Sequence, residues 1–279
     1  MTKTIIALCS AVTMLANAYG TPKLPKYGTE AWCKLPGAKE VIRAAETGDI
    51  FAKYFLAMLS DINGNPAPMD ALYHNPKTHD FIMNNEEKLY ESLRKFSDMG
   101  FYFTQQLLAG VYFNMQLTDK SLALYRKAAV QGDPVSQYNL GLMLYKQKTG
   151  AQVPAETVKW WELSAAQGNV GALKDMGLLH LKGEATGKPD VPQAIKYLEK
   201  AAERGNGQAL FLLGEIYEQG RNGKVDKDRA IKYYKAAAIQ HPDITKLPLH
   251  KVIPNGNNHQ SDTDILRENL QSKNPNKII

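Results

Sequence analysis

One recurring phrase limits what this chain can fold into. Each copy joins a helix-forming run that ends in Ala-Ala to a glycine and then to a second apolar run, as in Ala123 to Leu144, ALYRKAAVQGDPVSQYNLGLML. The copies are punctuated by Gly48, Gly100, Gly132, Gly168 and Gly205. The last three intervals are 32, 36 and 37 residues. Internal periods of this size predict an all-α solenoid of stacked helix pairs.

Alignment on these glycines produces a column of large apolar residues followed by a column of Ala or Gly. The large residues are Leu56, Leu108, Leu140, Met176 and Leu213, and the small ones are Ala57, Ala109, Gly141, Gly177 and Gly214. Glycine inside a helix costs roughly 1 kcal/mol relative to alanine. We therefore expect glycine here because a neighbouring helix comes too close for a side chain.

The residues around each repeat glycine predict helix caps. Glycine after the Ala-Ala segment suits a left-handed C-terminal cap. The Asp or Asn that often follows is expected to accept hydrogen bonds from free amides of the next helix. These acceptors are Asp49, Asp133, Asn169 and Asn206.

Two other positions invite a functional interpretation, but packing is the simpler prediction for both. Counting back from the next glycine places Trp161, rather than Trp160, in the column of Tyr125, Tyr197 and Tyr233. Trp161 is expected to pack between repeats, with an exposed binding aromatic as the alternative. His180 falls in the column of Tyr112, Leu144 and Tyr217 and is expected to be a packing residue.

The N-terminus resembles an export signal. Lys3 precedes an apolar run from Ile5 to Ala16, and Ala16-Asn17-Ala18 fits a small-x-small cleavage site. We expect a signal peptide over residues 1–18, cleavage near Ala18, and a periplasmic or secreted protein. The mature chain would keep one cysteine, Cys33, either buried and inert or available to pair between chains.

Composition divides the remainder of the chain. Residues 19–38 form a proline-containing lead-in, and the solenoid is expected over 39–241. A stretch rich in Asn, Pro, Asp and His interrupts it at 61–85, and long insertions of this kind are often functional. Residues 242–279 form a tail, in which Ser261-Asp262-Thr263 could cap a short helix through Gln271.

Charge and motifs exclude several classes of function. The net charge is +6, but Lys and Arg are mixed with Asp and Glu along every segment, so no nucleic-acid partner is expected. After the N-terminal signal no apolar stretch is long enough for a membrane span. The sequence has no G-x-S-x-G, H-E-x-x-H, P-loop or C-x-x-C motif, and it lacks the complete S-x-x-K, S-D-N and K-T-G set. His74, His79 and Asp80 share the insertion and could be metal ligands, although polar loop residues without a site are the simpler interpretation. We expect no metal, no cofactor and no catalytic residues.

The repeat resembles the Sel-like repeat family, a branch of the tetratricopeptide superfamily. The resemblance rests on Gly132-Asp133 followed by Gln137-Tyr138-Asn139-Leu140-Gly141, and on Ala194 to Gly205, AIKYLEKAAERG. It covers about residues 39–241 and implies a right-handed superhelix of antiparallel helix pairs. Members of this family mostly act as protein-binding adaptors. A cysteine-rich subgroup has been linked to penicillin binding and β-lactam hydrolysis, but its repeats carry disulfides that one mature cysteine cannot form.

The resemblance also implies that the first helix of each pair lines a concave, partner-binding groove. Counted from each glycine as the first position, the fourth, seventh, eleventh and fourteenth positions should point inward. These candidates are Phe51, Tyr54, Met58, Phe103, Gln106, Phe113, Tyr138, Leu142, Tyr145, Lys174, Leu178, Gln208, Phe211, Glu215 and Glu218. Aromatic and apolar residues of this kind are enriched at interface cores. Packing against a neighbouring helix, or against the C-terminal tail, is the alternative.

The expected function is a non-catalytic protein–protein interaction module. The most specific hypothesis is an immunity protein that neutralises a lipase effector of a type VI secretion system, since some family members resemble such proteins. A general envelope or virulence-associated scaffold is one alternative, and a β-lactam or peptidoglycan-directed hydrolase is another. The sequence leaves the oligomeric state open.

Overall fold

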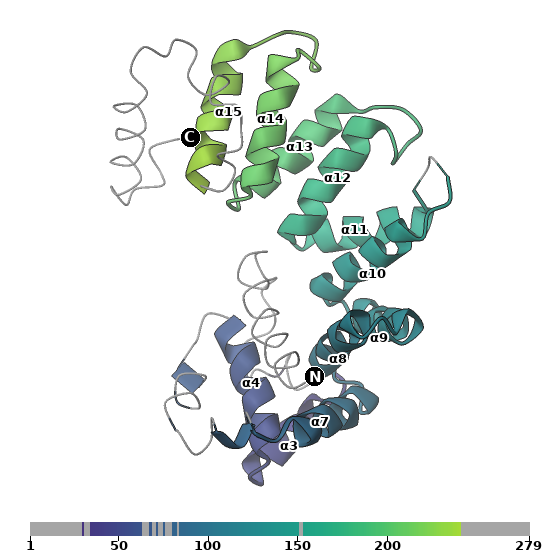
Figure 1. Ribbon diagram of the computed structural model, residues 1–279, viewed down its shortest axis with the longest axis vertical. Coiled ribbons are helices and arrows are strands. Elements are labelled where there is room, and N and C mark those ends of the chain that lie inside the picture. Colours follow the sequence, from purple (N-terminus) through teal and green to yellow (C-terminus); the bar gives the residue numbers. More distant parts are fainter. Residues whose placement is uncertain are drawn as a thin grey trace. The chain divides into compact units, whose positions relative to one another are not determined.

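The structure is a computed structural model (Figure 1) that describes residues 30, 34–62, 67–68, 71, 75, 80–82, 84–150 and 153–240. The predicted signal peptide, Cys33, His74, His79 and the predicted tail over 242–279 lie outside these residues. Within the described ranges the regular structure is entirely helical, which confirms the predicted all-α solenoid.

Apart from the segment between residues 62 and 86, the helices follow one another with short connections. In chain order they are α3 (Ala38–Glu46), α4 (Ile50–Ile62), α7 (Glu86–Asp98), α8 (Tyr102–Asn114), α9 (Thr118–Val130), α10 (Pro134–Lys146), α11 (Ala155–Ala166), α12 (Val170–Lys182), α13 (Val191–Ala202), α14 (Gly207–Glu218) and α15 (Lys227–Gln240). α4 continues two residues past Ser60 into the predicted insertion. The array resumes at Glu86, as the sequence predicts.

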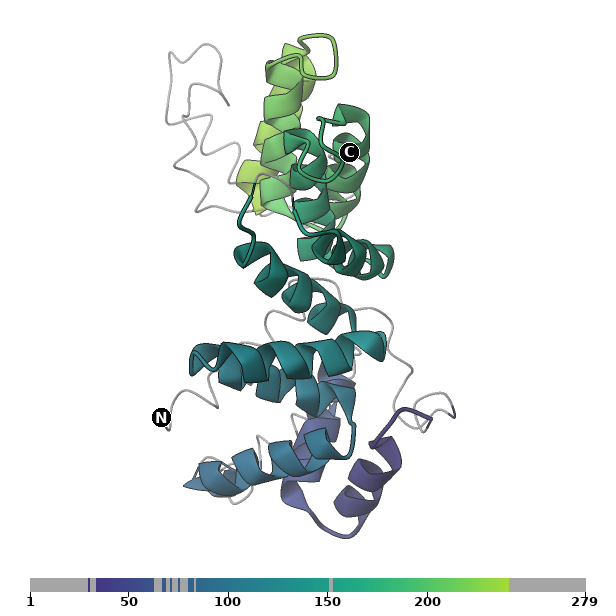
Figure 2. The same cartoon turned by 90° about the vertical axis from the view of Figure 1, so that its right-hand side faces the viewer.

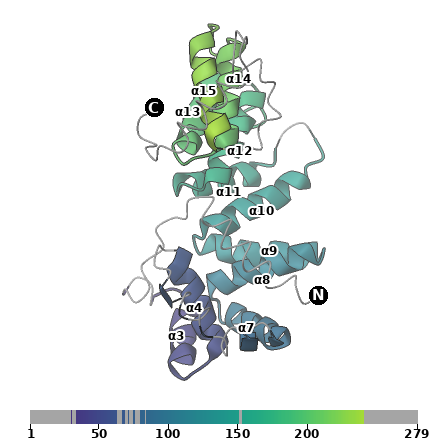
Figure 3. The ribbon, with the colours of Figure 1, turned by 60° about the vertical axis from the view of Figure 1, so that its left-hand side comes forward.

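The chain divides into two compact units, residues 1–172 and 173–279. In the first unit α8 packs against α9, α9 against α10, and α10 against α11. Figures 2 and 3 show α8 and α9 lying side by side. In the second unit α13 packs against α14, and α14 against α15 (Figure 1). Each helix therefore buries its apolar side only by stacking on its neighbours.

The repeat glycines have the predicted left-handed conformation. Their φ angles are +103° at Gly48, +92° at Gly100, +100° at Gly132, +88° at Gly168 and +81° at Gly205. After four of these five glycines, the next residue caps the following helix through its side chain. The acceptors are Asp49, Asp133, Asn169 and Asn206, which bond the amides of Ala52, Ser136, Ala172 and Ala209 at 2.7–3.0 Å. The predicted caps are confirmed.

The glycines inside the helices each lie against a side chain from the following helix. A Cβ at Gly141 would overlap Cδ1 and Nε1 of Trp161. A Cβ at Gly177 would lie 2.7 Å from Cγ of Leu198, and one at Gly214 would lie 2.5 Å from Cε1 of Tyr234. The closest atoms of the neighbouring helix belong in each case to a large side chain, and the predicted close approach is confirmed.

This packing corrects the predicted column of Trp161. The residues that cover the glycines are Trp161, Leu198 and Tyr234, which places Trp161 in their column. Tyr197 and Tyr233 instead stack on His180 and Tyr217, at ring-centroid distances of 5.5 and 5.6 Å. Trp160 belongs to the column of Tyr197 and Tyr233. It packs in a cluster with Leu144, and Leu144 occupies the same column as His180. The predicted match of Trp161 with Tyr125 holds, because both precede their repeat glycine by seven residues. The match with Tyr197 was wrong by one position, because Tyr197 precedes its glycine by eight. Trp161 is 2 % exposed, so its predicted role in packing is confirmed.

Glutamine side chains link successive repeats in the first unit. Gln137 donates to the Ala129 carbonyl at 3.1 Å and accepts from Gln167 at 2.9 Å. One repeat earlier, Gln105 donates to the Ser97 carbonyl at 3.1 Å and accepts from Gln131 at 2.8 Å. The next two repeats carry Leu173 and Leu210 in this column. Gln105 and Gln137 can be buried here because the amide of each forms hydrogen bonds.

We expect Gly141→Ala to lower the free energy of unfolding by about 1–3 kcal/mol, because the new methyl group collides with the buried Trp161 ring. Gly110→Ala is the matched control. Its Cβ would lie 3.6 Å from the nearest atom, Oη of Tyr125, and alanine favours the helix by up to about 1 kcal/mol. Urea denaturation followed by tryptophan fluorescence measures both changes. Equal effects of the two substitutions would contradict this account of the glycine column.

Asp133 predicts a pH-dependent stability. Burial raises its pKa from 3.8 to about 6, although hydrogen bonds from Ser136 oppose the rise. Because the pKa of Asp133 is higher in the folded state than in the unfolded state, its contribution to stability is fully present below about pH 4. That contribution is lost as the pH rises to about 6. Asp133→Asn keeps the cap, as Asn169 and Asn206 do. We expect the variant to match the wild type at pH 4 and to be more stable at pH 7, by about 3 kcal/mol at most. Urea midpoints across this range test the prediction, and a constant difference between the two proteins would refute it.

Candidate functional site

Five of the predicted groove residues form core instead of an open surface. Phe51, Tyr54 and Met58 on α4, and Phe103 and Gln106 on α8, are at most 6 % exposed. The physical reason lies partly in the insertion. Ile82, near its end, joins the same core cluster, and the ring of Phe81 lies 5.9 Å from that of Phe51. These five side chains offer a partner almost no accessible area.

The predicted positions on α10 form a partly exposed aromatic surface. Tyr138 and Tyr145 lie over the buried Trp161, with ring centroids 6.0 and 5.5 Å from it. Leu142 lies between them on the same helix and is also half-buried. Gly171 provides room for Tyr138, since a Cβ there would lie 2.9 Å from Cζ of the ring. The glycine and tryptophan therefore fix the positions of the two tyrosines.

Phe113, at the end of α8, extends this aromatic character in the first unit. It is 42 % exposed, and Nζ of Lys146 lies 5.3 Å from the centroid of its ring. Lys146 follows Tyr145 directly, so the predicted positions on α8 and α10 adjoin at this lysine. A cation over an aromatic face is a favourable pairing. The surface therefore combines exposed apolar area with positive charge.

In the second unit, four predicted groove residues line a single concavity of about 300 Å³ between α12 and α14. Its walls are Lys174, Leu178, Gln208, Phe211 and Leu212, and only Leu212 was not predicted. Lys174 pairs with Asp175, at an Nζ–Oδ1 distance of 2.6 Å. Three of its five lining side chains are apolar, and its polar groups are one amide and one ammonium.

Glu215 and Glu218, the remaining predicted positions, lie further along α14 and outside this lining. Both are half-buried. Oε2 of Glu218 accepts a hydrogen bond from the hydroxyl of Tyr234 at 2.8 Å. Burial, followed by the bond to Glu218, raises the pKa of Tyr234. The Tyr234 ring in turn packs 5.3 Å from Phe211, so it also supports one wall of the concavity.

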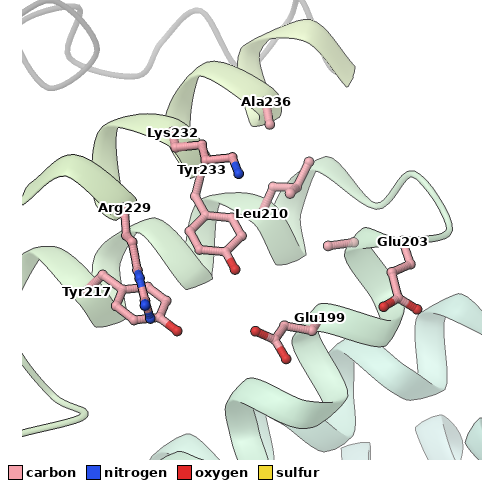
Figure 4. Close-up of a pocket in the computed structure, with 9 residues that line it drawn as sticks. Glu199, Glu203, Leu210, Tyr217, Arg229, Lys232, Tyr233 and Ala236 are labelled. Atoms are coloured by element: carbon pink, nitrogen blue, oxygen red, sulfur yellow. The ribbon is translucent and has the colours of Figure 1, made fainter. Parts of the chain in front are cut away.

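A larger cavity, of about 430 Å³, opens between α13 and α15 (Figure 4). It is lined by Glu199, Ala202, Glu203, Leu210, Tyr217, Arg229, Lys232, Tyr233 and Ala236. The sequence did not predict this cavity, because the groove positions were counted only on the first helix of each pair. Most of the lining residues lie on the second helices, α13 and α15. The i, i+4 pair of carboxylates, Glu199 and Glu203, was the one visible signal, and such pairs usually lie on solvated faces.

Within the described ranges, no group of three His, Cys, Asp or Glu side chains is arranged to hold a metal ion. His180 is 8 % exposed and stacks on Tyr197, which confirms its predicted packing role. In the same part of the chain, no helix has the length and apolar character needed to cross a membrane.

Comparison with known proteins identifies the repeat. The family model described as Sel1 repeat matches residues 116–133, 134–169, 171–206 and 207–241. Residues 116–241 of this chain are Sel1 repeats. The predicted resemblance to the Sel-like repeat family is confirmed, and the matched segments begin and end close to the predicted glycine boundaries. The Sel1-repeat fold is typically a non-catalytic scaffold for protein interactions.

Two solved structures and one curated relative illustrate the similarity. A Sel1-repeat protein from Oxalobacter formigenes has a TM-score of 0.53 and 23 % identity, over 83 % of this chain and 99 % of that one. A protective antigen of uropathogenic Escherichia coli with an SLR fold has a TM-score of 0.58 and 20 % identity, over 94 % of this chain and 60 % of that one. At these identities the likeness concerns the fold alone. An uncharacterized protein of Neisseria meningitidis is 27 % identical over 71 % of this chain and 45 % of its own length. The chain spans less than half the length of the curated relatives it matches.

Proposed function

We propose that this Sel1-repeat protein is a non-catalytic interaction module that binds a segment of a protein partner in the concavity between α12 and α14. The observation that carries the proposal is the lining of that concavity. Four of its five residues occupy positions that the repeat pattern assigns to the partner-binding face. Sel1 repeats as a class favour a protein partner.

The chemistry of the concavity fits an apolar side chain from an extended or helical segment. Leu178, Phe211 and Leu212 provide the apolar surface. Burying one Leu- or Phe-sized side chain there contributes about 1.5–3 kcal/mol, and a few such anchors dominate most interfaces. Gln208 is exposed at the edge, where its amide can bond the backbone of the bound segment.

The finer form of the proposal is an exported immunity protein that occludes the active site of a secreted effector. Its support is the signal-like N-terminus, residues 1–18, together with the family resemblance. Affinity capture from the envelope fraction of the producing cell should then recover one dominant effector. Recovery of several unrelated proteins would favour the general scaffold, and nitrocefin turnover by the purified mature chain would favour the hydrolase.

We expect Leu178→Glu to abolish capture of the partner, because it places a charge on the apolar wall of the concavity. Leu163→Glu is the matched control. Leu163 is 42 % exposed on α11 and lies outside the predicted positions. Both variants should keep the helical circular dichroism of the wild type. Quantitative pull-down with wild type and the two variants as bait makes the comparison. Equal loss from both, or from neither, would contradict binding at the concavity.

A further inference from the structure

We infer that the cavity between α13 and α15 is a second binding site, which takes one basic side chain, arginine or lysine, of a protein partner. The cavity is separate from the concavity between α12 and α14, since the two have no lining residue in common. Its volume of about 430 Å³ lies in the range of small ligand sites. The inference follows from the charges on its walls and the apolar surface between them.

The α13 wall carries two carboxylates that form no ion pair within the part of the chain that the structure describes. Glu199 and Glu203 are four residues apart, so they lie on the same face of the helix. Both are exposed at the cavity, and neither forms an ion pair with any described residue. Two adjacent carboxylates repel each other and favour a cation between them.

The cations on the α15 wall compensate this charge only in part. Arg229 is already engaged, because its Nε lies 3.3 Å from Oδ2 of Asp226 and its guanidinium lies 5.4 Å from the ring centroid of Tyr217. Figure 4 shows Arg229 beside Tyr217, and Lys232 further along the same helix. Lys232 therefore remains as one cation against two carboxylates. The local balance favours a positively charged ligand.

The surface between the walls suits the stem and head of a long basic side chain. Ala202, Leu210 and Ala236 are apolar and can contact the methylene groups. Tyr217 and Tyr233 stack with ring centroids 5.6 Å apart and an interplanar angle of 10°, which gives the cavity a rigid aromatic side. A cation can lie against an aromatic face and still reach a carboxylate.

Tyr233 also orients one carboxylate. Its hydroxyl points toward Glu199 (Figure 4). Burial, followed by the charge of Glu199, raises the pKa of Tyr233 to about 12. The hydroxyl therefore stays protonated at neutral pH and can donate to Glu199, leaving the other carboxylate oxygen for the ligand. A planar guanidinium has several donors and can bond this oxygen together with an oxygen of Glu203, so arginine should bind more tightly than lysine.

Titration of the full-length chain with N-acetyl-L-arginine amide, followed by amide NMR shifts, tests the inference. We expect saturable shifts confined to α13, α15 and the facing part of α14, with a dissociation constant on the order of millimolar. N-acetyl-L-norleucine amide has a similar stem without the charge and should cause no saturable shifts. N-acetyl-L-glutamate amide should not bind either.

The double substitution Glu199→Gln, Glu203→Gln should weaken arginine-amide binding about tenfold or more. Asp228→Asn, an exposed carboxylate of α15 outside the cavity, should leave binding unchanged. All three substitutions are at exposed positions, and the melting temperature checks that each variant is folded. Equal binding of the norleucine amide, preferential binding of the glutamate amide, or unchanged binding to the double variant would overturn the inference. Leu178→Glu should not affect this titration, so the two proposed sites can fail independently.

Discussion

The packing of one side chain onto a glycine of the preceding helix determines the rest of this structure. Trp161 on Gly141, Leu198 on Gly177 and Tyr234 on Gly214 are versions of the same contact. Each glycine gives up roughly 1 kcal/mol of helix propensity, and the large buried ring or leucine more than offsets this by removing apolar area from water. The contact also fixes the rotation of each helix about its axis. Every other residue of the repeat then has a determined direction.

That rotation decides which residues are available for binding. On α10 it turns Gly141 toward Trp161 and leaves Tyr138, Leu142 and Tyr145 partly exposed. On α14 it buries Leu213 and leaves Phe211 at the edge of a concavity. On α13 and α15 it leaves Glu199 and Tyr233 facing the space between the helices. The contacts that identify the family and the surfaces proposed for binding thus lie on different sides of the same helices.

The sequence predicted the fold well because its strongest signals are local. A glycine with φ near +100° and a capping Asp or Asn act within a few residues, so their pattern can be read directly. Grouping Trp161 with Tyr197 and Tyr233 was wrong by one position. The offsets of seven and eight residues from the repeat glycines already separate these residues, and the contacts with Gly141, Gly177 and Gly214 show which offset is equivalent. Five groove residues on α4 and α8 were misjudged because they are buried in the core. The insertion adds Phe81 and Ile82 to that region, and no repeat pattern describes an insertion.

The glutamine links of the first unit limit how this array can be rearranged by duplication or loss of repeats. A second copy of residues 132–167 would contain both Gln137 and Gln167. The Gln137 side chain of this copy would donate to a backbone carbonyl at the end of α11, as the original Gln137 donates to Ala129. Loss of the same residues would instead place Leu173 beside Ala129, whose carbonyl would lose its side-chain donor. Repeats that carry glutamine and repeats that carry leucine are therefore not interchangeable neighbours. The chain can lengthen within the glutamine segment at little energetic cost, whereas exchanges across its boundary are disfavoured.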